Sequence, residues 1–208
     1  LIQSAVIAMA NPGENILMPR NVHISVIKIC AMQNINPIFF DLEFSSRTGH
    51  YKPITKIWLE NVFKRLNFDE NKIAGVILVN PSYHGYSGDL EPLIDCCHQK
   101  NLPVLVDEAH GSYFLFCENL NLPKPALSSN ADLVVNSLHK SLNGLTQTAV
   151  LWYKGNLINE GNLIKSINLL QTTSPSSLLL SSCEESIRDW LNKKSLSKYQ
   201  KRILEAKS

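Results

Sequence analysis

The sequence predicts an α/β fold in which a mostly parallel β-sheet is flanked by helices. Short apolar runs with the length of strands alternate with longer segments whose apolar residues recur at helical spacing. The run at 73–79 carries no polar side chain, as expected for a central strand that is buried on both faces. A length of 208 residues, 44% of them hydrophobic, suffices for one domain with a large core.

The elements can be placed in order along the chain. Pro12 and Gly13 mark a turn that ends a first helix, and the apolar residues of 22–34 and of 53–66 fall on one helical face each. Helices are therefore expected at 1–10, 22–34, 53–66 and 90–100. Strands are expected at 16–18, 37–40, 73–79, 103–107, 132–136 and 148–153. The remainder of the chain is expected to be largely helical.

Bulk composition argues against several classes of partner. A formal net charge of +2 is too small to indicate binding to nucleic acid or to an acidic membrane surface. No apolar stretch approaches the length of a membrane span. The five cysteines have no CxxC spacing and lie at Cys30, Cys96, Cys97, Cys117 and Cys183. This usage is typical of buried thiols in the cytoplasm, where we expect the protein.

Polar residues follow three of the expected strands. Asn80, Asp107 and Ser137 each lie at the carboxyl end of a strand. In a parallel sheet these ends share one edge, where loops and helix N-termini converge on ligands. The three loops are therefore expected to form a common pocket.

Lys140 is the most informative residue at this edge. It follows the apolar run 132–135 and His139, and the preceding strand ends at Asp107. A lysine alone is most often a solvated surface residue, but a lysine withdrawn from water becomes a nucleophile towards an aldehyde. Pyridoxal 5′-phosphate needs a lysine for a Schiff base and a carboxylate that keeps its pyridine nitrogen protonated. The pairing of Lys140 with Asp107 therefore favours this cofactor.

Two other interpretations of these motifs are weaker. The segment DEAH at 107–110 also names a class of helicases, but those enzymes need a GxxxxGK[ST] phosphate loop, which this sequence lacks. Cys96, Cys97 and His98 are potential metal ligands, but adjacent helical cysteines point in different directions and no second pair follows at zinc spacing. We expect no metal site.

His23 allows two interpretations. Its position at the start of a helix is typical of a capping or core histidine. An imidazole at the end of a strand can also stack on a flat heteroaromatic ring. The residues alone leave both interpretations open.

Five motifs together resemble the Orn/Lys/Arg decarboxylases, basic amino-acid decarboxylases with the aspartate aminotransferase fold (fold type I). The motifs are RNVH at 20–23, NPSYHG at 80–85, LVDEAHG at 105–111, ADLVVNSLHK at 131–140 and TTSPS at 172–176. They occur in the family's order, and the compact form without an N-terminal wing domain fits best. The resemblance implies a cofactor-binding major domain at 1–175 and a helical segment at 176–208 that leads towards a C-terminal domain.

The resemblance implies a role for each residue around the cofactor ring. Lys140 would form the Schiff base with pyridoxal 5′-phosphate, and Asp107 would pair with the pyridine nitrogen. His23 would stack on one face of the ring, and Ala109 would pack on the other. His110 would belong to the same cofactor-binding set.

The remaining residues are implied to serve the phosphate and the reaction. Ser137 and His139 would contact the cofactor phosphate, while Thr173 and Ser174 would reach the phosphate of a neighbouring subunit. The implied reaction is decarboxylation of lysine, arginine or ornithine, with Lys140 or His139 returning a proton to Cα. A homodimer or higher homo-oligomer that binds a small basic amino acid is therefore expected.

The sequence also departs from the family pattern. Ile24 stands where lysine is usual, a change expected to affect only the helix surface, and Tyr113 replaces a common histidine. The family's phosphate loop would precede Leu1, so we expect a domain truncated at both ends that binds the cofactor weakly. An aminotransferase, another lyase or an inactive fragment remain alternatives, because the fold hosts several reactions.

Overall fold

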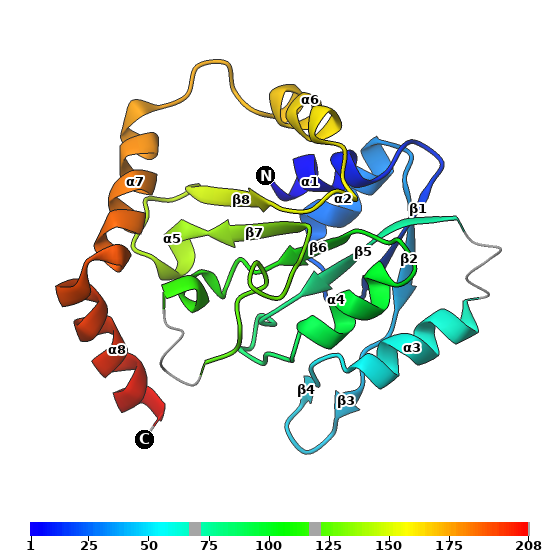
Figure 1. Ribbon diagram of the computed structural model, residues 1–208, viewed down its shortest axis with the longest axis horizontal. Helices are drawn as coiled ribbons and strands as arrows, with labels where there is room; N and C mark the ends of the chain where they lie inside the picture. Colours follow the sequence, from blue (N-terminus) through cyan, green and yellow to red (C-terminus); the bar gives the residue numbers. More distant parts are fainter. Residues whose placement is uncertain (67–71, 117–121, 208) are drawn as a thin grey trace.

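The computed structural model describes residues 1–66, 72–116 and 122–207, which are built around a six-stranded sheet (Figure 1). The strand order is β2-β1-β5-β6-β7-β8, and neighbours are parallel except for β7 with β8. The strands of this sheet are β1 (Asn15–Pro19), β2 (Asn36–Phe40), β5 (Ile73–Val79), β6 (Val104–Asp107), β7 (Leu133–Ser137) and β8 (Ala149–Tyr153). The predicted α/β fold with a mostly parallel sheet is confirmed.

Helices cover both faces of this sheet (Figure 1). They are α1 (Ile2–Met9), α2 (Ile24–Met32), α3 (Lys56–Arg65), α4 (Glu91–His98), α5 (Leu138–Ser141), α6 (Glu160–Leu170), α7 (Ser177–Leu191) and α8 (Lys193–Lys207), with a 3-10 helix, η1, at Ser112–Phe116. Helices α1, α2 and α6 pack on one face, and α3 and α4 pack on the other. Helices α7 and α8 lie beside α5, next to the β8 edge.

The side chains of the central strands alternate between two hydrophobic cores, one on each face of the sheet. On β1, Ile16 and Met18 pack with α1 and α2, whereas Leu17 packs on the side of α3 and α4. On β5, Ile77 packs on the side of α1 and α2, and Leu78 packs on the side of α3 and α4. All five side chains are at most 1% exposed, and burying a side chain of this size contributes about 1.5–3 kcal/mol. Burial on both faces explains why β5 is apolar at every position and why β1 is apolar at every position after Asn15.

The last strand, β8, runs antiparallel to β7. The connection from β7 to β8 runs over 138–148 and contains only the short helix α5, which falls short of the dozen or more residues that a parallel crossover takes. The strand expected at 132–136 lies one residue later, which makes Ser137 both its last residue and the N-cap of α5. Lys140 is therefore carried by a short helix just beyond the sheet.

Helix caps explain why two helices start later than expected. His23 caps α2, and Thr55 caps α3 with a side-chain oxygen that accepts a hydrogen bond from the Trp58 N–H at 3.3 Å. The expected starts at 22 and 53 were therefore too early. A small hairpin of β3 (Phe44–Ser45) and β4 (His50–Tyr51) was missed, because strands of two residues are too short to show periodicity.

The described residues bear on the membrane spans, metal sites and cysteines that the composition raised. No helix among them is long and apolar enough to cross a membrane. They contain no group of three or more His, Cys, Asp or Glu side chains placed to hold a metal ion. The described cysteines are free thiols, namely Cys30, Cys96, Cys97 and Cys183. Cys117 lies outside the described residues.

Candidate active site

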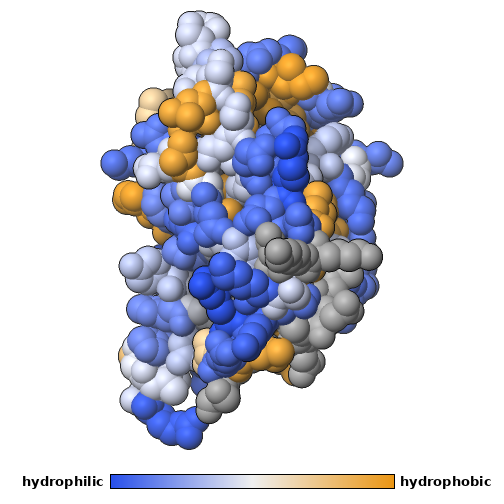
Figure 2. Space-filling view, turned by 90° about the vertical axis from the view of Figure 1, so that its left-hand side faces the viewer, coloured by the Kyte–Doolittle hydropathy of each residue, from blue (hydrophilic) through white to orange (hydrophobic). Residues whose placement is uncertain are grey.

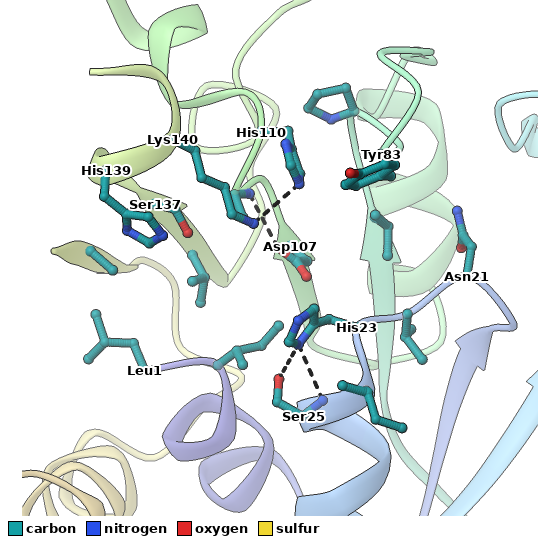
Figure 3. Close-up of a pocket in the computed structure, with 18 residues that line it drawn as sticks. Leu1, Asn21, His23, Ser25, Tyr83, Asp107, His110, Ser137, His139 and Lys140 are labelled. Atoms are coloured by element: carbon teal, nitrogen blue, oxygen red, sulfur yellow. Dashed lines mark hydrogen bonds between the residues drawn. The ribbon is translucent and has the colours of Figure 1, made fainter. Parts of the chain in front are cut away.

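The carboxyl ends of β5, β6 and β7 open into a pocket of about 510 Å³ (Figure 3). Its walls come from the loop before α2, the loop after β5, the end of β6 and the junction between β7 and α5. Seven predicted site residues line the pocket: His23, Asp107, Ala109, His110, Ser137, His139 and Lys140. Segments that are distant in the sequence thus meet at the sheet edge where ligands bind in folds of this kind.

Asp107 supplies a buried carboxyl group to this pocket. It is the last residue of β6, is 8% exposed, and accepts a hydrogen bond on Oδ1 from the Ala109 N–H at 3.2 Å. Burial raises the pKa of the Asp107 carboxyl above its ordinary value, while the Ala109 N–H and the charges of Lys140 and His23 act in the opposite direction. A cationic N–H donor against this carboxylate would offset much of the cost of its burial.

Lys140 reaches the pocket from α5. Its Nζ donates a hydrogen bond to Nε2 of His110 at 3.2 Å (Figure 3). Burial and the charge of Lys140 lower the pKa of His110, against the opposing effect of Asp107, and the neutral ring is the form whose Nε2 can accept from the lysine. The Tyr83 ring packs edge-on against His110, with centroids 5.4 Å apart. A lysine withdrawn from water was expected at this position, but Lys140 is exposed on the four-residue helix α5.

Ser137 and His139 occupy the junction between β7 and α5. Ser137 is 8% exposed, and its carbonyl accepts a hydrogen bond from the Ser112 hydroxyl at 3.1 Å. Nδ1 of His139 donates to the carbonyl of Thr148 at 2.8 Å, because a carbonyl can only accept. Nε2 is not used by this bond, so it can accept from a ligand when the ring is neutral and donate when it is protonated.

His23 is a helix cap that also lines the pocket. Its Nδ1 accepts a hydrogen bond from the Ser25 N–H at 3.2 Å and lies 2.7 Å from the Ser25 hydroxyl. The ring stands in the pocket at the start of α2 (Figure 3). The cap thus fixes one ring nitrogen and orients the imidazole, while ring stacking remains a prediction.

Comparison with known proteins identifies the family. The chain matches the model of the Orn/Lys/Arg decarboxylase major domain over residues 2–207. The chain belongs to this family. It is 36% identical over 183 residues to an arginine decarboxylase of Bacillus cereus and 34% identical over 183 residues to one of Bacillus subtilis. These matches cover 88% of this chain but only 38% and 36% of the two relatives, so the chain spans less than two fifths of their length.

Solved structures show the same fold at low sequence identity. The constitutive lysine decarboxylase of Escherichia coli superposes with a TM-score of 0.75 at 19% identity, over 88% of this chain and 26% of that one. A putative aminotransferase of Clostridium difficile, bound to pyridoxal phosphate, gives a TM-score of 0.71 at 17% identity, over 99% and 51% of the two chains. The fold is therefore shared by enzymes with different names, and the family assignment depends on the sequence match.

Other residues singled out from the sequence differ in whether they line this pocket. Thr173 and Ser174 are exposed in the linker between α6 and α7, outside the pocket. Ile24, the position where the family resemblance implies lysine, is 54% exposed on the surface of α2 and also lines the pocket, so this side of the helix surface faces the site. Asn80 does not line the pocket, because its side chain is turned into the loop, where its Oδ1 accepts from the Gly88 N–H at 2.9 Å.

Tyr83 is a pocket residue for which no role was predicted from the sequence. It lies in the decarboxylase motif at 80–85 and lines the pocket together with Pro81. Its position just after β5 was the available signal, because the residues that follow every parallel strand reach the same edge. Its contact with His110 depends on how the side chains of two loops pack, so the sequence pattern could not predict that contact.

Glu108, the residue after Asp107, was also overlooked, and it is completely buried. Its Oε1 accepts from the Ala126 N–H at 2.8 Å, and its Oε2 accepts from Nδ2 of Asn136 at 3.1 Å. Oδ1 of Asn136 in turn accepts from the Trp152 indole N–H at 2.8 Å. Burial raises the pKa of Glu108 to about 7, against the effect of both hydrogen bonds. This network joins the turn after β6 to strands β7 and β8.

Proposed function

We propose that this chain contains the cofactor-binding core of an enzyme that decarboxylates a basic amino acid with pyridoxal 5′-phosphate. The observation that carries the proposal is that Lys140, Asp107 and His23 line one pocket although they come from three separate segments. The family match and the similarity to arginine decarboxylases support the reaction, which yields an amine and CO₂. Lysine, arginine and ornithine are the candidate substrates, and arginine is the first to assay.

The pocket residues fit the cofactor ring. Asp107 is a buried carboxyl group, and a pyridinium N–H would stabilise its ionised form. Lys140 supplies a primary amine to the same pocket, and His23 and Ala109 supply a flat and a small surface against which a ring can pack. When bound, the cofactor supplies an electron-accepting pyridinium ring for the electron pair released with CO₂.

We assign phosphate binding, orientation of the lysine amine and proton transfer to the polar residues of the pocket. We assign the phosphate to Ser137 and His139, whose hydroxyl and Nε2 are the hydrogen-bonding groups at the β7–α5 junction. Neutral His110 accepts a hydrogen bond from Lys140 and so orients its amine. We assign the return of a proton to the substrate Cα to Lys140, or to His139 if its Nε2 faces the substrate instead of the phosphate, because both side chains line the pocket. Asp107, when ionised, holds the proton on the cofactor nitrogen.

A second subunit is part of the proposal. Thr173 and Ser174 would contact the phosphate of a neighbouring subunit, and the linker that carries them is exposed. Hydrophobic side chains gather at the upper end of the molecular side shown in Figure 2. The segments that flank the linker expose Leu169, Leu170, Leu178 and Leu180. A homodimer or larger homo-oligomer would remove such side chains from water. Light scattering tests this assignment, and a fully active monomer would contradict it.

The deciding experiment is an assay of the full-length protein with the cofactor. Carboxyl-labelled arginine, lysine and ornithine are supplied separately, and both labelled CO₂ and the amine product are measured. We expect both products from at least one of the three substrates. Transfer of the amino group to a keto acid without release of CO₂ would show instead that the protein is an aminotransferase.

A further inference from the structure

Helix α7 contacts the turn at 142–148, which joins α5 to β8 (Figure 1). The Ser186 hydroxyl donates a hydrogen bond to the carbonyl of Leu142 at 2.5 Å, and the Ser182 hydroxyl accepts one from the Leu145 N–H at 2.8 Å. The two serines are four residues apart and therefore lie on the same face of α7. Ser186 is 4% exposed, so its hydrogen bond is shielded from water.

Aromatic side chains extend this contact. Trp190 lies one turn further along the same face of α7, is 4% exposed, and packs with Leu138 and Leu142. Tyr199 of α8 stacks on Trp190 with ring centroids 4.4 Å apart. The Tyr199 hydroxyl accepts a hydrogen bond from Nδ2 of Asn143 at 2.7 Å. The turn is thus held by polar and apolar contacts from two helices.

The same turn fixes the side chains that α5 presents to the pocket. The carbonyl of Thr148 accepts hydrogen bonds from Nδ1 of His139 at 2.8 Å and from the Leu138 N–H at 3.0 Å. The carbonyl of Leu138 accepts one from the Leu142 N–H at 2.9 Å. Helix α5 has only four residues, which is too short to be stable without such contacts. The position of Lys140 therefore depends on the turn.

We infer that Ser182 and Ser186 are positioning residues, which act through the turn at 142–148 to hold Lys140 in the pocket. Loss of the Ser186 hydroxyl would leave the buried carbonyl of Leu142 without its donor, so the turn would have to shift towards water. Loss of the Ser182 hydroxyl would release the Leu145 amide. The effect on cofactor binding rests on the proposed function, whereas the effect on the turn and on Lys140 does not.

The test compares Ser182→Ala and Ser186→Ala with Ser181→Ala, a matched control at the neighbouring exposed position of α7. Three quantities are measured in the full-length protein well below its melting temperature. The first is hydrogen exchange of the backbone amides at 142–148. The second is labelling of Lys140 by an amine-reactive reagent, which is measured by peptide mass spectrometry. The third is the affinity for pyridoxal 5′-phosphate, which is measured by absorbance titration. Ser182→Thr keeps the hydroxyl at a half-buried site and serves as the rescue variant.

For the alanine variants at 182 and 186 we expect amide exchange in the turn to rise about tenfold, in line with the loss of one hydrogen bond. Labelling of Lys140 should change several-fold, and the dissociation constant of the cofactor should rise roughly fivefold to tenfold. Ser181→Ala and Ser182→Thr should match the wild type in all three measurements. Should Ser186→Ala fail to fold, Ser182→Ala decides the question.

Two results would overturn the inference. Unchanged exchange at 142–148 in both alanine variants would show that α7 does not hold the turn. Faster exchange with unchanged Lys140 labelling would show that the turn does not position the lysine. If the wild-type protein shows no cofactor binding at all, the proposed function fails, and the labelling of Lys140 still decides the inference.

Discussion

The two sides of the pocket hold their proposed reactive groups in different ways. On the β6 side, Asp107 and Glu108 are 8% and 0% exposed and accept hydrogen bonds from backbone or amide N–H groups. On the β7 side, Lys140 is exposed and is carried by a four-residue helix. The carboxylate is therefore placed by the sheet itself, whereas the lysine is placed by a turn and by the helix packed on it. Distant substitutions should disturb the lysine more readily than the carboxylate.

The largest effect is expected for Lys140→Ala. The substitution removes the amine proposed to bind the cofactor aldehyde, so decarboxylation should fall by about 10⁴-fold or more, as when a nucleophile is deleted from other enzymes. Borohydride reduction followed by peptide mass spectrometry should no longer find the cofactor attached to this position. Lys28→Ala, at an exposed position on α2, is the matched control and should leave both measurements unchanged. A Lys140→Ala protein with wild-type turnover would exclude the proposed mechanism.

Asp107→Asn tests the β6 side of the pocket. The amide keeps the shape of the side chain but cannot hold a proton on the cofactor nitrogen by charge. Turnover should fall by about 10²–10³-fold, the range for removal of one preorganised electrostatic contact. Because the sheet places this residue, the melting temperature should change little and the cofactor should still attach to Lys140. Asp95→Asn on the exposed face of α4 is the control. Equal turnover of Asp107→Asn and wild type would remove the proposed role of the carboxylate.

The fold and the β6 side of the site could be predicted because both follow from strands with uninterrupted apolar sequences. A run such as 73–79 indicates a buried strand, and Asp107 directly after another run must then lie at the ligand-binding edge. The buried network of Glu108 could not be predicted in this way. It depends on the Ala126 backbone and the Asn136 side chain, which approach only once the chain is folded.

The β7 side was less predictable for a related reason. Lys140 was recognised from its place after a strand, but its exposure and its contact with His110 depend on how a four-residue helix is oriented. That orientation comes from Ser182 and Ser186, more than forty residues away in the chain. Local periodicity carries no information on such a contact, since both serines are ordinary polar residues within an amphipathic helix.

Glu108→Gln tests how the buried carboxyl on the β6 side of the pocket makes folding stability depend on pH. Because burial raises the pKa of Glu108 from 4.5 to about 7, the folded protein binds a proton that the unfolded chain releases between these pH values. The stability linked to this group is therefore complete below pH 4.5 and is lost as the pH rises through 7, by about 3 kcal/mol in total. The glutamine variant cannot titrate and should lack this decline.

The measurement is denaturant unfolding of both proteins from pH 4.5 to 8. The stability of Glu108→Gln relative to the wild type should increase with pH, whatever fixed cost the amide carries from meeting the N–H groups of Ala126 and Asn136. Other titrating groups, including Asp107 and His110, are present in both proteins and cancel in the comparison. Parallel stability curves would show that Glu108 does not titrate in this range.

The smallest effect is expected at His23, which the α2 helix places in the pocket through its cap. His23→Asn keeps a capping acceptor for the Ser25 N–H but removes the ring, so stability should be retained while cofactor affinity falls by about 0.5–1.5 kcal/mol. His23→Phe keeps a ring but removes the acceptor, so it should cost about 1 kcal/mol of stability and retain more of the affinity. Thermal unfolding and absorbance titration of the two variants separate these roles. Wild-type affinity in His23→Asn would show that the histidine only caps α2, and the position of the cofactor ring would then depend on Ala109 and the β6 side alone.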